Sequence, residues 1–321
     1  MQQDTALLRG LADVARDAAH PPAPPHACRG CGSAGGGVLA DRDGGTVVRH
    51  GRAVAKAHAP GTDPVAHRAR LAVAAHPRLA GILLPPLPVS TADVRGRPVS
   101  AWPYGTPVDP AEPEAAPWEE AATLLARLHA VPAPGLPGPL PPMRGPAKVV
   151  RAMTRLRQAA GAAAHPGAAA VHAAWRRLPA WARAEAPAQR ADAVCHGDFH
   201  LGQLVRHPAA DGPWLLIDVD DLGLGDPAWD LARPAAWYAA GVLPAQVWTR
   251  FLGAYRAAAG PAVPPHGDPW PALDVPARAL TVQTAALALA KATAAGRELD
   301  EVELAVVDSC ARIATLPSEL G

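Results

Sequence analysis

The chain of 321 residues has no asparagine, only three lysines, and aromatic side chains at 4% of its positions. Its net charge of +1 argues against an extended basic surface for nucleic acid. It has no apolar run of about 18 residues or more and no N-terminal signal pattern, so we expect no membrane partner. Four irregularly spaced cysteines form no disulfide framework, which favours a cytoplasmic enzyme.

Proline and glycine are abundant, and they gather near the N-terminus. We expect a helix over residues 4–19 and a Pro- and Gly-rich linker over 21–37, so residues 1–37 form a leading segment. Within it, His26, Cys28 and Cys31 have the spacing H-x-C-x-x-C, which is typical of half a zinc site. No second Cys/His pair follows at finger spacing, so a loop with unpaired thiols is the favoured interpretation.

Residues 38–105 change to short runs of β-type sequence and predict a small, β-rich N-terminal lobe. Turns at 43–45 and 50–51 separate the first runs, and Asp63 with Pro64 predicts the start of a helix that reaches about Ala75. Five strands are expected, at residues 37–40, 46–49, 53–56, 82–84 and 97–101.

Residues 106–321 read as a larger helical lobe. Helices are expected near 117–129, 147–160, 166–187, 227–240, 244–259, 275–296 and 298–315. A β-rich start followed by a helical remainder indicates an α+β fold of two lobes.

One segment carries most of the chemical information. The sequence Cys-His-Gly-Asp-Phe-His-Leu-Gly-Gln over residues 195–203 places Asp198 in a polar loop and Gln203 five residues later. Asp218 then follows the apolar run 214–217. One carboxylate that accepts a hydroxyl proton, with further oxygen atoms that hold Mg²⁺, is the set that phosphoryl transfer needs.

This segment resembles the catalytic segment of the aminoglycoside phosphotransferase family, and the likeness covers about residues 38–300. The resemblance implies a bilobal protein-kinase-like fold, Asp198 as the catalytic base, and Asp218 as a metal ligand. Gln203 stands where the family usually has asparagine, and its side chain offers the same carbonyl oxygen. The form with Gln also resembles maltokinases, which are typically longer, and the sequence Gly-Asp-Pro-Ala-Trp-Asp-Leu-Ala over 225–232 favours the first family. Asp226 and Asp230 within it are expected as loop and helix-cap groups.

The N-terminal lobe carries the expected nucleotide contacts. Lys56 ends an Ala-Val-Ala-Lys strand and resembles the kinase lysine that binds the α- and β-phosphates. Gly44 and Gly45 form either a phosphate-covering loop or an ordinary hairpin turn. Trp102 and Tyr104 mark either a hinge whose backbone faces adenine or packing between lobes.

The usual partner of the lysine is missing, because no glutamate lies between residues 56 and 102. Lys56 is therefore expected to pair with Asp218 or with nucleotide phosphate alone. Asp220 and Asp221 either add negative charge near the metal ion or a cationic substrate, or are simply solvated.

These features predict an ATP-dependent kinase, with GTP left open, that uses Mg²⁺ and phosphorylates a hydroxyl group of a small molecule. Antibiotic or sugar-like alcohols are what the resemblance implies, and with them a role in antibiotic resistance. We expect a monomer or weak dimer. Two alternatives remain open: a Ser/Thr peptide kinase in a biosynthetic pathway, and a nucleotide-binding pseudokinase, suggested by Gln203 and the missing glutamate.

Overall fold

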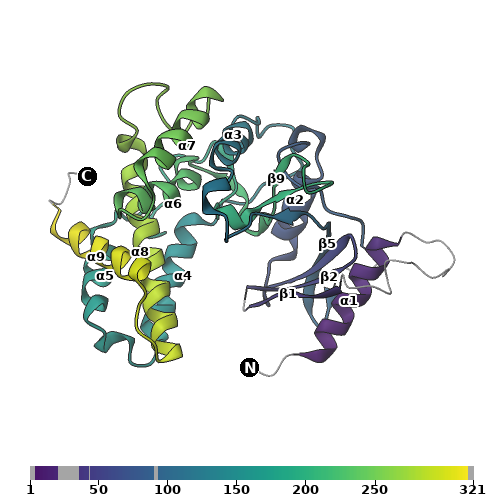
Figure 1. Cartoon of the computed structure of the whole chain (residues 1–321), viewed down its shortest axis with the longest axis horizontal. Coiled ribbons are helices and arrows are strands. Elements are labelled where there is room, and N and C mark those ends of the chain that lie inside the picture. The colour runs from purple at the N-terminus through teal and green to yellow at the C-terminus, as the bar shows by residue number, and fades with distance from the viewer. Residues whose placement is uncertain (1–3, 21–35, 43, 90–92, 317–321) are drawn as a thin grey trace. The chain divides into compact units, whose positions relative to one another are not determined.

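The computed structural model describes residues 4–20, 36–42, 44–89 and 93–316 (Figure 1). The H-x-C-x-x-C sequence lies outside these residues. The chain divides into two compact units. The first unit comprises Met1–Val108, Leu136–Leu140 and Leu204–Asp220, and the second comprises Asp109–Gly135, Pro141–Gln203 and Asp221–Gly321.

An antiparallel sheet of five strands forms the centre of the first unit, in the order β1-β2-β3-β5-β4. The strands are β1 (Gly36–Arg42), β2 (Gly45–His50), β3 (Ala53–His58), β4 (Asp93–Val94) and β5 (Arg97–Pro103). Helix α1 (Thr5–Ala19) packs its buried Leu7, Leu11 and Val14 against Val48 and Val99 of the sheet. Their spacing of three and four residues puts these three side chains on one helix face, which produces the core of this unit.

Helix α2 (Pro64–Ala74) begins as the sequence predicts, since the carboxylate of Asp63 accepts a hydrogen bond from the N–H of Val65 at 2.9 Å. The prediction of a strand at residues 82–84 is wrong. Leu83 forms only an isolated bridge with Leu216, because Gly81 turns the chain at φ +71° and two prolines follow at 85–86. A second sheet joins β6 (Thr106–Pro107), β8 (Leu204–Arg206) and β9 (Trp214–Leu216) in the order β6-β8-β9.

The second unit is mostly helical. Its helices are α3 (Trp118–His129), α4 (Gly145–Gln158), α5 (Pro166–Arg177), α6 (Ala228–Ala239), α7 (Ala245–Ala257), α8 (Trp270–Ala295) and α9 (Glu301–Thr315), and β7 (Ala193–Cys195) pairs with β10 (Gly223–Gly225). Helix α8 packs against α4, α5, α6 and α9 and buries Leu273, Val282 and Leu289, so it forms the centre of this unit. Single-turn 3₁₀ helices complete the chain: η1 (Pro77–Leu79), η2 (Pro113–Ala115), η3 (Ala162–Ala164), η4 (Leu201–Gln203) and η5 (Val219–Asp221).

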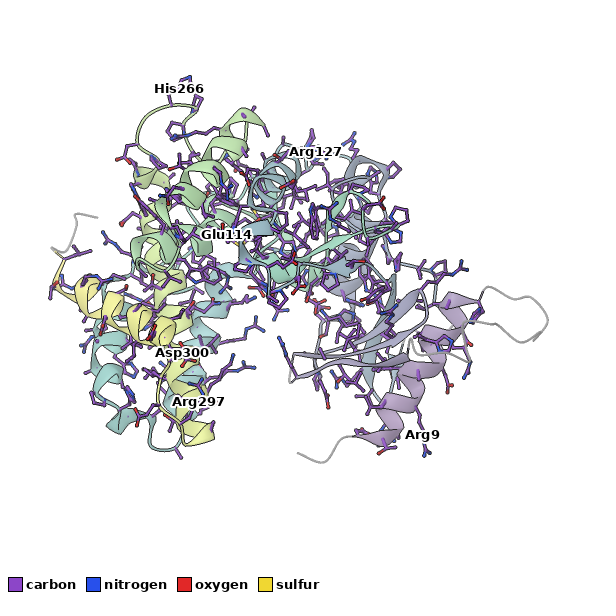
Figure 2. All side chains as sticks on the ribbon, in the orientation of Figure 1. Arg9, Glu114, Arg127, His266, Arg297 and Asp300 are labelled. Carbon is purple, nitrogen blue, oxygen red and sulfur yellow. The ribbon has the colours of Figure 1, made fainter. Side chains whose placement is uncertain are left out.

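Two helix boundaries differ from the prediction. Helix α5 ends at Arg177 rather than near residue 187, because Leu178 precedes a proline and adopts an extended conformation. Helix α8 begins five residues earlier than expected, at Trp270, and accommodates Pro276 inside its buried stretch. Helix α9 starts with a capping box between Asp300, labelled in Figure 2, and Glu303. A first unit built around a sheet and a second, mostly helical unit confirm the predicted α+β class.

Candidate functional site

In the first unit, Lys56 lies between two carboxylates. Its Nζ is 2.7 Å from Asp218 Oδ1 and 2.9 Å from Asp220 Oδ2. Burial alone would lower the pKa of Lys56, but the two carboxylates outweigh it and raise that pKa above its ordinary value. Lys56 therefore pairs with Asp218, one of the partners that the sequence leaves open, and with Asp220 as well. Asp218 adopts a left-handed backbone conformation at φ +62°, which is unfavourable outside glycine.

The glycine turn lies close to this lysine. A Cβ atom on Gly45 would approach Lys56 Cε and the carbonyl oxygen of Ala57, each to 3.2 Å, so a glycine is favoured at this position. A Cβ atom on Gly44 would meet nothing within 4 Å. Within the described part of the chain, the space beside Gly44 is therefore open, and Gly44 directly precedes the glycine next to Lys56.

The predicted hinge residues have partners inside the first unit. Buried Trp102 donates a hydrogen bond from Nε1 to Ser100 Oγ at 2.9 Å. The ring of Tyr104 lies 3.4 Å beneath the guanidinium of Arg49, and its backbone N–H donates to the carbonyl oxygen of Arg52 at 2.7 Å. Trp102 is therefore fixed within β5, and Tyr104 is fixed directly after it.

Asp220 also contacts a histidine. His58 Nδ1 lies 2.8 Å from Asp220 Oδ1, and His58 Nε2 lies 2.7 Å from Ser100 Oγ. Burial of Asp220 opposes ionisation, but Lys56 and His58 together hold the pKa of this carboxyl well below its usual range. Asp220 is thus a half-buried carboxylate that is paired with both Lys56 and His58.

In the second unit, Asp230 of α6 holds the loop after β7 through hydrogen bonds to its backbone. Asp230 is 1% exposed, and its carboxylate accepts hydrogen bonds from the N–H groups of His196 at 2.6 Å and Gly197 at 2.8 Å. Gly197 has φ +81°, and a Cβ atom there would lie 2.2 Å from the carbonyl oxygen of Asp221. The loop therefore needs both the buried carboxylate and the glycine, and together they aim the next residue, Asp198.

Asp198 projects into a pocket of the second unit, and both of its oxygen atoms have cationic partners. Oδ1 lies 3.1 Å from Arg233 Nη2, and Oδ2 contacts Lys148 Nζ. Lys148 also lies 2.9 Å from Asp221 Oδ2, so this lysine again bridges two carboxylates. Burial works to raise the pKa of Asp198, but Lys148 and Arg233 lower it below its usual value. The carboxylate is therefore ionised at neutral pH.

The lining of this pocket mixes apolar rings with polar groups. It comprises Gly145, Lys148, Gly197, Asp198, Phe199, Trp229, Arg233, Leu280 and Gln283. The ionised carboxylate of Asp198 therefore lies beside both apolar rings and further polar groups.

Gln203 lies in η4 and is buried, and its N–H donates to the carbonyl oxygen of His200 at 2.8 Å. His200 in turn accepts a hydrogen bond from Gly202 N–H at Nδ1, which braces this loop. Burial is the largest cause that lowers the pKa of His200, to about 4. Asp218 is one-third exposed and uses Oδ1 for Lys56. A carboxylate and an amide carbonyl are oxygen donors that Mg²⁺ accepts, so these residue types fit that ion.

Sequence reasoning missed the residues that orient Asp198. Lys148 had a usable signal, because it is one of only three lysines in an arginine-rich chain. Asp226 behaves as predicted and accepts a hydrogen bond from Ala228 N–H at 3.0 Å. Asp230 is not a helix cap, because it lies buried beneath the loop and also accepts a hydrogen bond from His129 Nε2 at 2.9 Å.

Known proteins resemble this chain in sequence pattern and in fold. The family model described as phosphotransferase enzyme family matches residues 41–273. No curated protein matches the chain. Among the described residues, no helix is both long and apolar enough to cross a membrane.

Three solved structures share the fold. Aminoglycoside phosphotransferase APH(4)-Ia is 15% identical with a TM-score of 0.53, over 89% of this chain and 94% of that one. Spectinomycin phosphotransferase APH(9)-Ia, in complex with ADP and spectinomycin, is 12% identical with a TM-score of 0.53, over 88% and 90%. Choline kinase LicA from Streptococcus pneumoniae is 16% identical with a TM-score of 0.52, over 86% and 93%.

At these identities the solved structures are evidence for the fold alone. They confirm the expected protein-kinase-like α+β architecture. The family model covers more than half of the chain and includes Lys56, the loop of Asp198 and the strand before Asp218. The chain therefore belongs to the phosphotransferase enzyme family, and it is a small-molecule phosphotransferase.

Proposed function

We propose that this enzyme transfers the γ-phosphate of ATP to a hydroxyl group of a small antibiotic or sugar-like molecule, with Asp198 as the base. The acceptor oxygen forms a bond to the γ-phosphorus, the bond between that phosphorus and the β–γ bridging oxygen breaks, and ADP leaves. The hydroxyl proton passes to the Asp198 carboxylate. The observation that carries the proposal is the ionised Asp198 in a pocket, fixed by Lys148 and Arg233.

A carboxylate held by two cations is a weak base but a well-oriented one. Phosphoryl transfer through a loose transition state asks mainly for alignment of the attacking oxygen, and it asks little of the base until late in the reaction. The two cations keep Asp198 ionised and limit its rotation, because each carboxylate oxygen has its own partner. The arrangement therefore suits the orientation of a hydroxyl group.

For the nucleotide, we assign Lys56 to the α- and β-phosphates, and Gly44 with Gly45 to the phosphate-covering turn. The segment from Trp102 to Tyr104 borders the adenine, where the two side chains hold the backbone in place through their contacts with Ser100 and Arg49.

Asp218 and Gln203 are the proposed oxygen ligands of Mg²⁺, which when bound neutralises charge on the β- and γ-phosphates. Lys56 orients the Asp218 carboxylate by binding Oδ1. The other carboxylate oxygen of Asp218 is then left for the metal ion, and this arrangement supports Asp218 as an Mg²⁺ ligand.

The test compares Asp198→Asn with Asp192→Asn, a matched control whose carboxylate is exposed and paired with Arg190 on the surface. Transfer of radiolabelled phosphate from ATP is measured against a panel of aminoglycosides, macrolides, sugars and amino alcohols. We expect the Asp198 variant to lose about 10²–10⁴ in kcat, with nucleotide binding by calorimetry retained, and the control to match the wild type. Wild-type turnover in the Asp198 variant would refute the assignment.

A further inference from the structure

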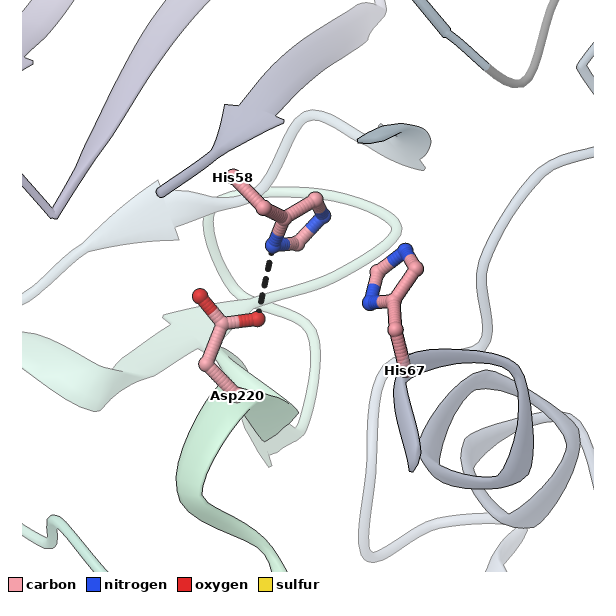
Figure 3. A group of neighbouring side chains, drawn as sticks. All are labelled: His58, His67 and Asp220. Carbon is pink, nitrogen blue, oxygen red and sulfur yellow. Dashed lines mark ion pairs between the residues drawn. The ribbon is translucent and has the colours of Figure 1, made fainter. Parts of the chain in front are cut away.

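A cluster of three potential metal ligands lies within the first unit, apart from the residues assigned to Mg²⁺. We propose that His58, His67 and Asp220 form a site for a divalent transition-metal ion of the Zn²⁺ type. The three side chains come from β3, α2 and the segment after β9, and Figure 3 shows their polar atoms turned toward one another. The site does not depend on the proposed acceptor or on phosphate transfer.

The distances are close to those of a metal centre. One nitrogen from each histidine and one carboxylate oxygen of Asp220 lie within 4.8 Å of one another, and His58 Nδ1 is 2.8 Å from Asp220 Oδ1. The two imidazole rings have centroids 4.1 Å apart. Ligand atoms of tetrahedral zinc, with bonds of about 2.0–2.2 Å, are roughly 3.3–3.6 Å apart. Binding therefore needs the ligand atoms to move closer together by about an ångström.

His67 supplies the independent sign of a ligand. Its side chain is 6% exposed, and its Nε2 has no hydrogen-bond partner among the described residues. A buried polar nitrogen without a partner is uncommon and calls for an explanation, such as an ion. Figure 3 shows the ring of His67 reaching from α2 toward His58 and Asp220.

His58 and Asp220 are also arranged as ligands. Ser100 Oγ lies 2.7 Å from His58 Nε2, which directs Nδ1 to the cluster, and ligating histidines usually have such a partner on the second nitrogen. Among the described residues, the nearest partner of His58 Nδ1 is Asp220 Oδ1, and their short contact is not a well-directed hydrogen bond. Lys56 binds Asp220 Oδ2, so Oδ1 faces the histidines.

The ligand types select the kind of ion. Two imidazole nitrogens with one carboxylate suit Zn²⁺ and its first-row neighbours, whereas Mg²⁺ takes oxygen ligands. A second cluster in the described residues, formed by His129, Cys195 and Asp230, makes a useful contrast. There both His129 nitrogens are engaged, by Tyr255 at 2.8 Å and Asp230 at 2.9 Å, so neither nitrogen of that histidine is left for a metal ion.

A bound ion would link α2 to η5, which carries Asp220, a partner of Lys56. In this chain no glutamate lies between residues 56 and 102, and Lys56 binds Asp220 instead. The metal would join His67 on α2 to Asp220, and through Asp220 to the lysine. It would thereby supply, through coordination, a link between α2 and Lys56.

The test uses the full chain, stripped with a chelator and titrated with Co²⁺ in a large excess of Mg²⁺, which occupies oxygen-ligand sites. We expect visible d–d absorption that saturates at one equivalent and disappears when Zn²⁺ is added. His67→Gln should weaken Co²⁺ binding at least tenfold. The matched control His266→Gln, at an exposed histidine labelled in Figure 2, should bind as the wild type does. Circular dichroism verifies folding, and His58→Gln replaces His67→Gln if the latter fails to fold.

Two results would overturn the proposal: no saturable absorption in the wild type, or equal Co²⁺ affinity in the wild type and the folded His67 or His58 variant. A melting temperature that Zn²⁺ raises in the wild type but not in His67→Gln would support it. Asp198→Asn should bind Co²⁺ normally. Its binding therefore separates failure of this site from failure of the proposed phosphate transfer.

Discussion

Replacement of Asp230 by asparagine should loosen the loop of Asp198 and destabilise the second unit. The carboxylate accepts three hydrogen bonds in the interior: from Gly197 N–H on Oδ1, and from His196 N–H and His129 Nε2 on Oδ2. Asparagine has a single acceptor oxygen. Whichever way its amide turns, an NH₂ group faces at least one N–H donor, and that donor is left buried without a partner.

The expected cost follows from these contacts. A hydrogen bond to a charged group contributes about 1.5–3 kcal/mol, and a buried donor without a partner costs a similar amount. Loss of one bond at Gly197, together with loss of the charge at the other two, amounts to about 3 kcal/mol. That is roughly a hundredfold change in the unfolding equilibrium constant. Turnover should fall as well, because Asp198 adjoins the two N–H groups that Asp230 holds.

Urea unfolding followed by tryptophan fluorescence measures this cost, because seven of the nine tryptophans lie in the second unit. Burial opposes ionisation of Asp230, but His129 holds its pKa below the usual range. The stabilisation is therefore complete above the unfolded pKa of about 4 and declines as pH falls through the lower folded value. Asp192→Asn is the control. If Asp230→Asn lies within about 0.5 kcal/mol of that control at pH 7, the interpretation of Asp230 as a loop anchor is wrong.

Three further outcomes follow from named contacts. Gly197→Ala should destabilise the second unit by several kcal/mol in urea unfolding and abolish turnover, because its Cβ atom would collide with the carbonyl of Asp221; wild-type activity would contradict this. Lys148→Met should shift the acidic limb of the kcat/KM profile to higher pH, because the cation that most lowers the pKa of Asp198 is gone; an unmoved limb would argue against the pairing. Asp300→Ala should lower the free energy of unfolding by about 1 kcal/mol, and an unchanged melting temperature would show that the capping box adds nothing.

Local signals predicted most of the fold. Asp63 followed by Pro64 determines where α2 begins, and the turn glycines separate β1, β2 and β3. The apolar run at 82–84 misled because strand pairing depends on a partner elsewhere in the chain. Local sequence contains no information that Leu83 would meet only Leu216. Likewise, Pro276 is a residue type that usually marks a helix boundary. Yet α8 continues through it, and Leu273, Pro276 and Ala277 are all buried there.

In the candidate site, too, the sequence predicts some residues and not others. The motif around residues 195–203 identified Asp198 and Gln203 as candidates, and their roles stay predictions. The groups that bind Asp198, namely Lys148 and Arg233, come from α4 and α6, and they are brought to it by the packing of helices around α8. Such partners have no fixed spacing from the motif, so the motif does not identify them, and the rarity of lysine is the one sequence signal that singles out Lys148.

Two of the three lysines occupy equivalent chemical positions, and this explains why they are lysines. Lys56 Nζ lies between Asp218 and Asp220, and Lys148 Nζ lies between Asp198 and Asp221. A single ammonium nitrogen can donate to two carboxylates at once from one point, whereas the planar guanidinium of arginine directs its donors in a fixed fork. A chain that uses arginine almost everywhere else therefore retains lysine where one compact charge must orient two acids. Asp218 and Asp220 in the first unit and Asp198 in the second are proposed functional residues, and in each unit the lysine sets the direction in which these carboxylates point.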